Sequence, residues 1–336
     1  MNPFDKHVPS VFSIGTPFQA LCAIATIRQL EIEDYLFLLN LSSNRERYDQ
    51  LCTLLEKYDI NFKVVNPYNR IRRHYGKWQA LRKHKSRFKR LFIGDFRDIL
   101  LYYTSLGYVA DGSSVVYLDD GNVTISLLLE TISEPLKEET LSFWNEVKNK
   151  RSIDVNKNIL TIYEKIDNPK YTIRILDLSI LLNCQNEEYY ANEVYIVGTN
   201  INSYCDFLDI SYDIVINEIE KLIKKIKIEY PKDRVIYVPH GRDKSEYAKT
   251  LCEKYGVDFE PSEMLIELTL MNKQYPPKAI YGFTSSALFN IKKIYPQTRI
   301  VNVFFDFKVV NSGVQEYLMI SDYYKKNGIE LMIETL

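Results

Sequence analysis

The sequence predicts an α/β protein built from two Rossmann-like domains that face a central cleft. The chain has 336 residues, which is long for one hydrophobic core and suits two domains of about 150 residues each. Hydrophobic residues make up 46% and charged residues 26% of the chain, as in ordinary globular proteins. Short apolar runs alternate with helix-length amphipathic stretches, which is the pattern of parallel strands joined by crossover helices.

The first series of apolar runs predicts five buried parallel strands. The runs are short, rich in branched or aromatic residues, and end in turn residues. They are Val11–Gly15, Tyr35–Leu39, Phe62–Val65, Leu91–Gly94 and Val115–Leu118. Helical patterns such as Gln19–Leu30 and Arg45–Lys57 lie between them, so the first half reads as βαβ units in a doubly wound sheet.

A mostly polar segment separates this series from a second one. Residues from Ser126 to Asn192 have a helical pattern interrupted by Pro135 and Pro169, and we interpret them as the passage between the two halves. The second series predicts strands at Val194–Val197, Arg234–Val238, Val257–Phe259, Ala279–Gly282 and Ile300–Phe304. We therefore expect an N-terminal domain over residues 1–190 and a C-terminal domain over residues 191–336.

Charge, cysteines and hydropathy exclude several classes of protein. The 43 Lys and Arg residues against 44 Asp and Glu residues give a net charge of −1, which argues against a wholly polyanion-binding surface. The five cysteines include no C-x-x-C pair, so neither a disulfide framework nor a zinc site is indicated. Residues 1–9 lack the pattern of an export signal, and no run reaches the roughly 18 apolar residues of a membrane span. We expect a cytoplasmic chain, bound at most to a membrane surface.

One segment departs from the average composition. Arg70–Arg90 holds ten Lys or Arg residues, together with His74, His84 and Trp78, and no acidic residue. It is either a solvated helix face or a patch for an anionic membrane or a phosphorylated glycolipid, to which each basic residue contributes on the order of 1 kcal/mol. Nucleic acid is a weaker third interpretation, because no recognised nucleic-acid motif accompanies the patch.

In doubly wound folds, ligands bind at the carboxyl ends of the strands, so the residues after each strand are the site candidates. The first strand is followed by Thr16-Pro17-Phe18-Gln19. Proline in the first turn is a plain helix-start signal. Thr16 and Gln19 nevertheless place hydrogen-bonding groups beside a helix N-terminus, which favours anions.

The fifth strand is followed by Asp119-Asp120-Gly121-Asn122. As local structure this is a turn with a helix cap. Two adjacent carboxylates at the mouth of a cleft also suit general-base catalysis, because crowding raises the proton affinity of one of them. A pair of this kind could also hold Mg²⁺, but no second acidic cluster supports a metal site.

In the second half, the strand at 234–238 is followed by Pro239-His240-Gly241. A lone histidine is more often structural than catalytic, but this position after a core strand favours a functional role. The next loop, Phe259-Glu260-Pro261-Ser262-Glu263, can offer a carboxylate to ribose hydroxyls. The structural alternative makes Glu263 an acidic residue in the first turn of a helix.

The strand at 279–282 is followed by two hydroxyl residues, Ser285 and Ser286, at the start of a predicted helix. Paired hydroxyls and free backbone N–H groups form a cradle for one phosphate. The Gly-rich loop and lysine of a P-loop are missing, which argues against ATP hydrolysis. Helix capping alone would explain one serine but not two.

Taken in order along the chain, these motifs resemble those of bacterial sialyltransferases. The resemblance is closest to the lipooligosaccharide and capsule sialyltransferases of glycosyltransferase family 52, which have a GT-B-like fold. It rests on Thr16–Gln19, Asp119–Gly121, His240 and Ser285–Ser286 and spans essentially the whole chain. Gly241 departs from the family pattern, which has proline at that position, and this puts the rigidity of the loop in question.

The resemblance implies an inverting transfer of sialic acid from CMP-sialic acid to a hydroxyl of a galactose, or a similar sugar, on a bacterial surface glycan. It implies no metal and no cofactor besides the donor. Asp120, alone or with Asp119, would be the general base, and His240 would join Ser285 and Ser286 at the phosphate. The remaining residues implied to bind substrate are Thr16, Gln19, Gly121, Gly198, Thr199, Asn200, Pro239, Gly241 and Glu263.

Two other functions stay open from the sequence. One is a glycosyltransferase of the same fold with another nucleotide sugar as donor. The other is a non-catalytic module whose basic segment binds an anionic glycan or membrane. The expected partners are CMP-sialic acid and a galactose-terminated acceptor, with no nucleic acid, and the sequence is compatible with a homodimer.

Overall fold

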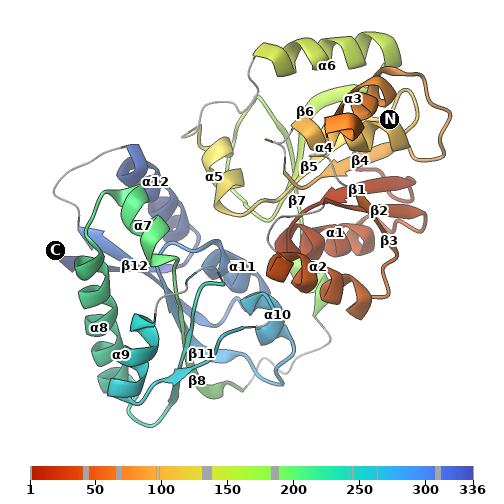
Figure 1. Ribbon diagram of the computed structural model, residues 1–336. Helices are drawn as coiled ribbons and strands as arrows, with labels where there is room; N and C mark the ends of the chain where they lie inside the picture. Colours follow the sequence, from red (N-terminus) through yellow and green to blue (C-terminus); the bar gives the residue numbers. More distant parts are fainter. Residues whose placement is uncertain are drawn as a thin grey trace. The chain divides into compact units, whose positions relative to one another are not determined.

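The computed structural model describes residues 2–40, 45–65, 70–95, 97, 99–130, 138–182, 189–241, 243, 246–262, 264–306 and 312–335. The chain divides into two compact units, Met1–Leu181 (unit 1) and Leu182–Leu336 (unit 2), which Figure 1 shows with their helices and strands. The sequence analysis set the boundary between residues 190 and 191.

Unit 1 contains a parallel sheet with the strand order β3-β2-β1-β4-β5-β6-β7 in the described residues. The strands are β1 Ser10–Ile14, β2 Tyr35–Asn40, β3 Phe62–Val65, β4 Arg90–Ile93, β5 Ser114–Leu118, β6 Asp154–Thr161 and β7 Thr172–Ile175. The order reverses between β1 and β4, which makes the sheet doubly wound and puts its topological switch point there.

Helices connect and cover the strands of unit 1. They are α1 Pro17–Gln29, α2 Arg45–Lys57, α3 Arg70–Leu81, α4 Ile99–Ser105, α5 Asn122–Leu128 and α6 Glu138–Arg151, with short 3₁₀ turns at Leu106–Tyr108 and Leu178–Leu181. Helix α1 packs with α2, whereas α3 packs with α4 and α6. Helices that precede and follow the switch point thus form two separate packing groups, as right-handed crossovers require.

Unit 2 repeats this plan with the strand order β10-β9-β8-β11-β12-β13. Its strands are β8 Ala191–Val197, β9 Arg234–Val238, β10 Asp258–Phe259, β11 Pro277–Gly282, β12 Arg299–Asp306 and β13 Glu330–Thr335. Its helices are α7 Ile201–Leu208, α8 Tyr212–Glu229, α9 Tyr247–Tyr255, α10 Ile266–Met271, α11 Ser286–Ile294 and α12 Ser312–Lys326. The switch point lies between β8 and β11.

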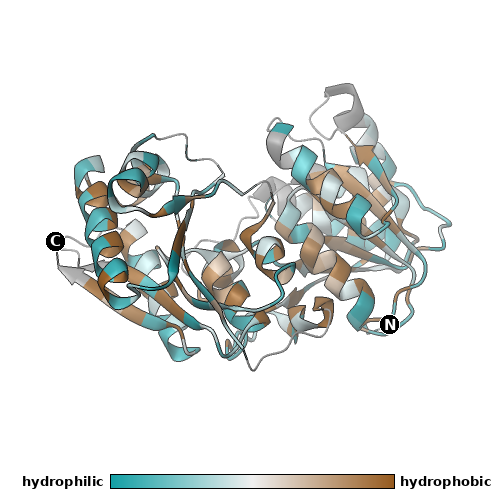
Figure 2. Cartoon of the chain, turned by 90° about the horizontal axis from the view of Figure 1, so that it is seen from below, coloured by the Kyte–Doolittle hydropathy of each residue, from teal (hydrophilic) through white to brown (hydrophobic). Residues whose placement is uncertain are grey.

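Each unit has its own hydrophobic core. In unit 1, Phe12 of β1 stacks on Phe37 of β2 and on Phe92 of β4, with ring centroids 5.0 and 4.7 Å apart. In unit 2, the buried face of α8 packs in one cluster with residues of β8, β9 and β11. Figure 2 shows hydrophobic strands and helix faces turned inward and hydrophilic helix faces turned outward. All ten predicted strands are present, so the doubly wound prediction is confirmed.

The helical prediction for residues 126–192 holds for α6 but misses β6 and β7, which lie in this segment and extend the sheet of unit 1. Strand β6 begins with the polar residues Asp154, Asn156 and Lys157, so its sequence lacks the apolar pattern that predicts a buried strand. Buried Asn158 is accommodated because its amide donates a 3.1 Å hydrogen bond to the Val115 carbonyl of β5. Strand β13 at the other end of the chain was also missed.

The basic segment is not uniformly exposed. Arg90 is fully buried in β4, and its guanidinium donates hydrogen bonds to the carbonyl oxygens of Pro3, Asp5 and Val8 and to the Ser10 hydroxyl. It therefore anchors the N-terminal residues and belongs to the core rather than to a surface patch. Within the part of the chain that the structure describes, no helix has both the length and the apolar character needed to cross a membrane.

Candidate functional site

In unit 1, three neighbouring strands end at one edge of the sheet. Strands β1, β4 and β5 are adjacent and parallel, with Ser13 opposite Ile93 and Ile93 opposite Tyr117. The residues that follow these strands therefore start at the same level. This edge includes the switch point between β1 and β4, where doubly wound folds bind ligands.

Thr16 and Gln19 follow β1 and start helix α1. Thr16 is the N-cap, and its hydroxyl accepts a 3.1 Å hydrogen bond from the Gln19 backbone N–H. The Gln19 side chain is 1% exposed and bridges two loops: Oε1 accepts from Gly15 N–H at 2.9 Å, and Nε2 donates to Asp120 at 2.8 Å. A Cβ at Gly94 would lie 2.4 Å from Gln19 Oε1, so the loop after β4 needs glycine for this bridge to form.

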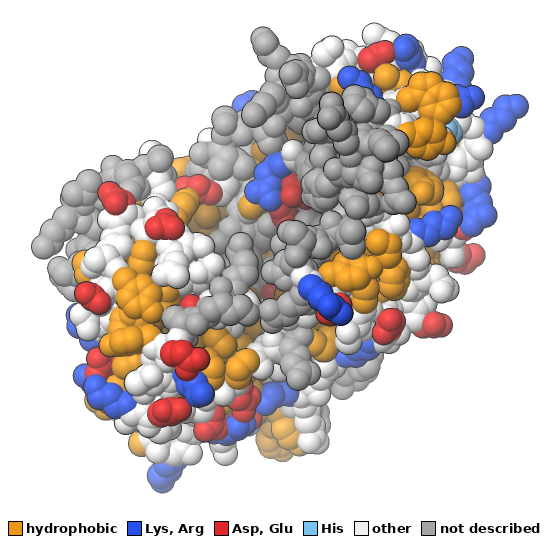
Figure 3. Space-filling model, viewed as in Figure 1, with side chains coloured by type: hydrophobic (Ala, Val, Ile, Leu, Met, Phe, Trp, Pro, Cys, Tyr) orange, Lys and Arg blue, Asp and Glu red, His pale blue; other side chains and the backbone are white. Residues whose placement is uncertain are grey.

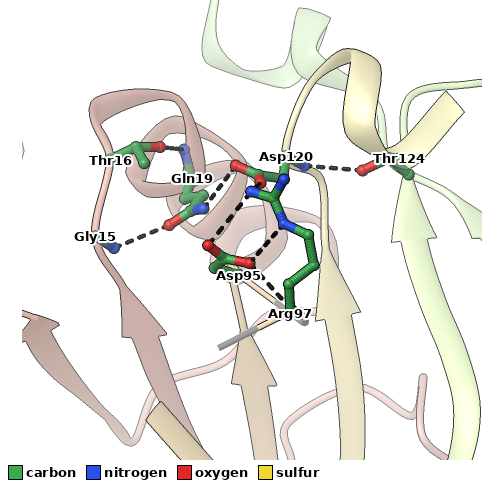
Figure 4. A network of polar contacts seen from close by, with 7 residues as sticks. All are labelled: Gly15, Thr16, Gln19, Asp95, Arg97, Asp120 and Thr124. Carbon is green, nitrogen blue, oxygen red and sulfur yellow. Dashed lines mark hydrogen bonds and ion pairs between the residues drawn. The ribbon is translucent and has the colours of Figure 1, made fainter. Parts of the chain in front are cut away.

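Asp120 follows β5, and its carboxylate is held from two sides (Figure 4). Oδ1 accepts from Gln19 Nε2, and Oδ2 accepts from Arg97 Nη2 at 2.9 Å. The Asp120 backbone N–H donates to the Thr124 hydroxyl at 2.9 Å. The Asp120 side chain is 13% exposed, so its oriented carboxylate remains reachable from solvent.

Asp95 and Arg97 follow β4, and the sequence analysis did not single them out. The Arg97 guanidinium donates to both Asp95 oxygens, at 3.1 and 3.4 Å, and also to Asp120. Burial alone would lower the pKa of Arg97. The carboxylates of Asp95 and Asp120 raise it by a larger amount, so the pKa of Arg97 lies above its ordinary value. The signal that could have found both residues is their position directly after the strand at Leu91–Gly94, next to the first strand.

Asp119 is fully buried, unlike Asp120. Its Oδ2 accepts from the Ile162 N–H at 2.7 Å, and its Oδ1 has no hydrogen-bond partner among the described residues. Burial raises the pKa of the Asp119 carboxyl to about 7. The sequence predicts Asp120, alone or with Asp119, as the general base, and the structure places Asp119 in the interior and Asp120 partly exposed. Gly121 then takes a φ of +66° and precedes α5, a conformation that favours glycine.

Unit 2 brings a second set of predicted residues to one sheet edge. Val197 of β8 pairs with Val238 of β9 on one side and with Gly282 of β11 on the other. The loops that follow these three strands hold Gly198, Thr199, Asn200, Pro239, His240, Gly241, Ser285 and Ser286. All of these residues thus lie on loops at the carboxyl edge of the sheet, around the switch point between β8 and β11.

The loops after β8 and β9 are close to each other. A Cβ at Gly198 would lie 2.6 Å from the Tyr237 hydroxyl of β9, so only glycine fits there. Asn200 caps α7, with its side chain accepting from the Ser203 N–H at 3.5 Å. His240 is half-buried, and its carbonyl accepts from the Asp243 N–H at 2.8 Å. A Cβ at Gly241 would meet no atom within 4 Å, so a side chain at this position has room for its first atom.

The loop after β11 is held in an unusual conformation. Thr284 has a φ of +45°, which is rare for a β-branched residue. Its N–H and hydroxyl donate to Asn302 Oδ1 of β12 at 2.7 and 3.1 Å, and Asn302 Nδ2 donates to the Ser321 hydroxyl of α12. All three side chains are buried. This arrangement fixes the backbone immediately before Ser285.

Ser285 and Ser286 differ in what their hydroxyls do. Ser285 is the N-cap of α11, and its hydroxyl accepts from the Ala287 N–H at 3.3 Å. For Ser286, the described residues supply no hydrogen bond to the hydroxyl, and the side chain is half-buried. The start of α11 therefore offers the Ser286 hydroxyl beside the positive end of the helix, which suits an anion, while Ser285 accepts from the N–H groups of Ala287 and Leu288.

Glu263 lies outside the described residues, so its predicted role at a ribose stays a prediction. Among the described residues, no group of three or more His, Cys, Asp and Glu side chains has the arrangement of a metal site.

Neither the family models nor the curated proteins include a match to this chain. Among solved structures, MurG of Acinetobacter baumannii is similar over 97% of this chain and 85% of its own, with 9% identity and a TM-score of 0.47. An α/β-galactoside α-2,3-sialyltransferase of Photobacterium phosphoreum is similar over 97% of this chain and 99% of its own, with 12% identity and a TM-score of 0.46. UGT89C1 of Arabidopsis thaliana, in complex with UDP-L-rhamnose, is similar over 98% of this chain and 85% of its own, with 9% identity and a TM-score of 0.50.

At these identities, a likeness concerns the fold alone. The likeness to the plant protein agrees with the two doubly wound parallel sheets described above. The chain has two Rossmann-like domains in succession, which is the GT-B fold.

Proposed function

We propose that this chain is an inverting glycosyltransferase that moves sialic acid from CMP-sialic acid to a hydroxyl of a terminal galactose. The main support for the proposal is the position of the Asp120 carboxylate. It lies at the sheet edge of unit 1, oriented by Gln19 and Arg97, and it is still partly exposed. A fixed and reachable carboxylate is what a general base for an acceptor hydroxyl requires.

The sheet edge of unit 2 supports the donor half of the proposal. The CMP leaving group is a monophosphate, and hydroxyls with helix N–H groups at the start of α11 can hold such a charge. The imidazole of His240 can add one more hydrogen bond. The galactose acceptor and the sialic acid donor rest on the resemblance of the motifs, since the fold alone does not define a substrate.

The reaction balances with these residues. The acceptor oxygen forms a bond to the anomeric carbon of the donor, and its proton goes to the Asp120 carboxylate. The bond from the anomeric carbon to the phosphate oxygen breaks, and CMP leaves with the electron pair. Attack on the face opposite CMP inverts the configuration through an oxocarbenium-like transition state.

Asp119 has a supporting role in this scheme. Its buried carboxyl accepts the Ile162 N–H from the segment after β6, and so ties β5 to the neighbouring loop. Because Asp119 is fully buried whereas Asp120 is partly exposed, proton transfer is assigned to Asp120. Gln19 and Arg97 are positioning residues, since they act through Asp120.

The test is to incubate the pure protein with CMP-sialic acid and lactose, and to measure CMP release together with the mass of the product. We expect a sialylated disaccharide, formed at nearly the same rate in excess EDTA. If a UDP-sugar gives a product and CMP-sialic acid does not, the proposed donor is wrong but the protein is still a glycosyltransferase. Absence of any transfer product across donors and galactosyl acceptors would overturn the proposal and favour a non-catalytic binding module.

A further inference from the structure

The outer side of α3 in unit 1 carries two large aromatic side chains that are not packed into the core. Tyr75 is 58% exposed and Trp78 is 50% exposed, and their ring centroids lie 5.6 Å apart. Arg82 follows one turn later, with its guanidinium carbon 4.3 Å from the Trp78 ring centroid. Tyr75 and Trp78 are three residues apart and so lie on one side of the helix, and Arg82 comes directly after its last residue, Leu81.

Basic side chains surround this aromatic pair. Lys77, Arg82, Lys83 and Lys85 are exposed, and the charge of Lys83 helps to lower the pKa of Asp111. Residues 60–94 contain no acidic residue at all. Figure 3 shows hydrophobic and basic side chains gathered at the upper right, over the part of unit 1 that carries α3. We call Tyr75, Lys77, Trp78, Arg82, Lys83 and Lys85 the α3 patch.

The loop that carries Lys83 and Lys85 is anchored. The His84 N–H donates to Asp111 Oδ1 at 3.1 Å, and His84 Nε2 lies 2.7 Å from the Gln79 carbonyl oxygen. Arg151, which is fully buried, donates to the same Asp111 oxygen at 2.9 Å. His84 thus faces inward between two lysines that face outward, so the patch is presented by fixed backbone.

We propose that the α3 patch docks the protein on an anionic lipid surface. Trp and Tyr side chains favour the membrane–water interface, where an apolar ring and a polar edge are both accommodated. Lysines around them gain from the negative potential of anionic headgroups. This combination distinguishes the patch from an ordinary solvated helix face, where large exposed aromatic pairs are not expected.

Several residues of the basic segment do not take part. Arg90 is buried, His84 is turned inward, and Arg87 pairs with Asp34 at 2.7 Å. The side chains of residues 70–74 lie outside the described part of the chain. The proposal therefore rests on six residues of the segment rather than on its total count of basic residues, and it does not depend on which sugar the protein transfers.

The test is co-sedimentation of the full chain with vesicles of phosphatidylcholine alone and with vesicles of phosphatidylcholine and phosphatidylglycerol in equal parts. We expect binding to the mixed vesicles only, weakening as salt rises, because exposed charges are screened over about 8 Å at physiological ionic strength. The triple variant Lys77→Gln, Lys83→Gln, Lys85→Gln should bind the mixed vesicles on the order of 100-fold more weakly, at about fivefold for each lysine.

A matched control removes three exposed lysines from unit 2, by Lys232→Gln, Lys249→Gln and Lys325→Gln. It has the same net charge as the patch triple and should bind like the unaltered protein. The double variant Tyr75→Ala, Trp78→Ala should also lose binding, whereas Phe207→Ala, Tyr247→Ala, which removes exposed aromatics from unit 2, should not.

Four results with vesicles or with the protein alone would overturn the proposal, and a fifth comes from a nucleic-acid assay. These are equal binding to both kinds of vesicle, binding to neither, and equal losses in the patch and control triples. The fourth is a concentration-dependent dimer that the aromatic double variant abolishes, which would make the patch an interface between two copies of the chain. A gel-shift assay with single- and double-stranded oligonucleotides completes the test, since tighter binding there than to mixed vesicles would assign the patch to nucleic acid instead.

Discussion

The two sheet edges share a topology but differ in chemistry. In unit 1 the residues after β1, β4 and β5 form a charged network in which Asp120 accepts from Arg97, and Arg97 also binds Asp95. In unit 2 the loop after β11 is held by neutral groups, with Asn302 accepting from Thr284 and donating to Ser321. Both networks lie beside the switch point of a doubly wound sheet.

The difference shows that a repeated fold does not repeat its chemistry. Strand order determines where a ligand can bind, but the residues after the strands determine what is done there. A carboxylate with fixed partners suits proton transfer, whereas hydroxyls and helix N–H groups suit an anion that must be held without a cation. The proposed function assigns the first role to unit 1 and the second to unit 2.

The largest expected effect is on turnover when the carboxylate of unit 1 is removed. Asp120→Asn keeps the acceptor atom for one partner but cannot take a proton, so the rate should fall by about 10²–10⁴-fold. CMP affinity should stay nearly unchanged, because the nucleotide is assigned to unit 2. Initial rates and calorimetric CMP affinity check this. Asp95→Asn, which alters the same network one residue further out, should lose much less activity. Equal losses of turnover and CMP affinity in Asp120→Asn would contradict the division.

The second prediction concerns the stability of unit 1 and the buried carboxyl of Asp119. Its pKa is raised to about 7 in the folded chain by burial and is about 4 in an unfolded chain. Between these values the folded state binds a proton that the unfolded state has released. The free energy of unfolding should therefore fall as pH rises, by about 1.4 kcal/mol per pH unit and about 4 kcal/mol in all.

Asp119→Asn should remove this dependence, because the amide does not titrate. The unfolding free energy of the variant relative to the unaltered chain should rise from about pH 4 to about pH 7 and then level off. Both tryptophans, Trp78 and Trp144, lie in unit 1, so tryptophan fluorescence in urea reports on this unit. Curves that stay parallel across the whole pH range would show that Asp119 is ionised in the folded state.

The third prediction concerns the phosphate groups of unit 2. His240→Ala should weaken CMP binding by about 10-fold to 100-fold, since a hydrogen bond to a charged group contributes roughly 1.5–3 kcal/mol. Turnover should fall with it. Ser285→Ala together with Ser286→Ala should behave similarly. If these variants bind CMP normally while Asp120→Asn does not, the donor belongs to unit 1 and the division is reversed.

The apolar patterns of the strands predict most of the fold. Runs such as Val11–Gly15 and Val115–Leu118 are apolar because both faces of a parallel strand are covered. That rule fails where a strand starts in polar residues, as β6 does, or lies at the sheet edge, as β7 does with mostly exposed residues. Such strands are defined by their pairing with β5 and β6, and a local pattern does not show pairing.

The candidate site, like the fold, could be predicted only in part. Gln19 and Asp120 follow from the rule that residues after neighbouring parallel strands meet, and they do form a hydrogen bond 2.8 Å long. The rule cannot separate Asp119 from Asp120, because which carboxylate is buried depends on packing against the segment after β6. Asn302 was missed because it lies inside a strand, and only the tertiary structure brings it to Thr284.

The smallest expected effect is on CMP affinity in Asn302→Ala. This variant separates a role of Asn302 in positioning the loop before Ser285 from a role in the stability of unit 2. Asn302→Ala removes the acceptor that holds Thr284 at a positive φ, a conformation that costs on the order of 1–3 kcal/mol. The loop before Ser285 should then relax, and CMP affinity should fall roughly tenfold, as for one lost hydrogen bond to a charged group. The matched control is Asn168→Ala in unit 1, where a buried amide donates to the Leu128 carbonyl at 2.9 Å. Both variants should lose about 1–3 kcal/mol of stability in urea, but only Asn302→Ala should weaken CMP binding.

Adding Thr284→Gly to Asn302→Ala provides the rescue, since glycine adopts a positive φ without strain. The double variant should recover part of the CMP affinity, although it cannot restore the hydrogen bonds to Asn302. A merely structural role for Asn302 would give a different result: both alanine variants would then change CMP affinity by the same small amount, and the glycine would restore nothing. Recovery of affinity by glycine would instead show that the backbone conformation before Ser285, and not the Asn302 side chain itself, prepares the helix N-terminus for the phosphate.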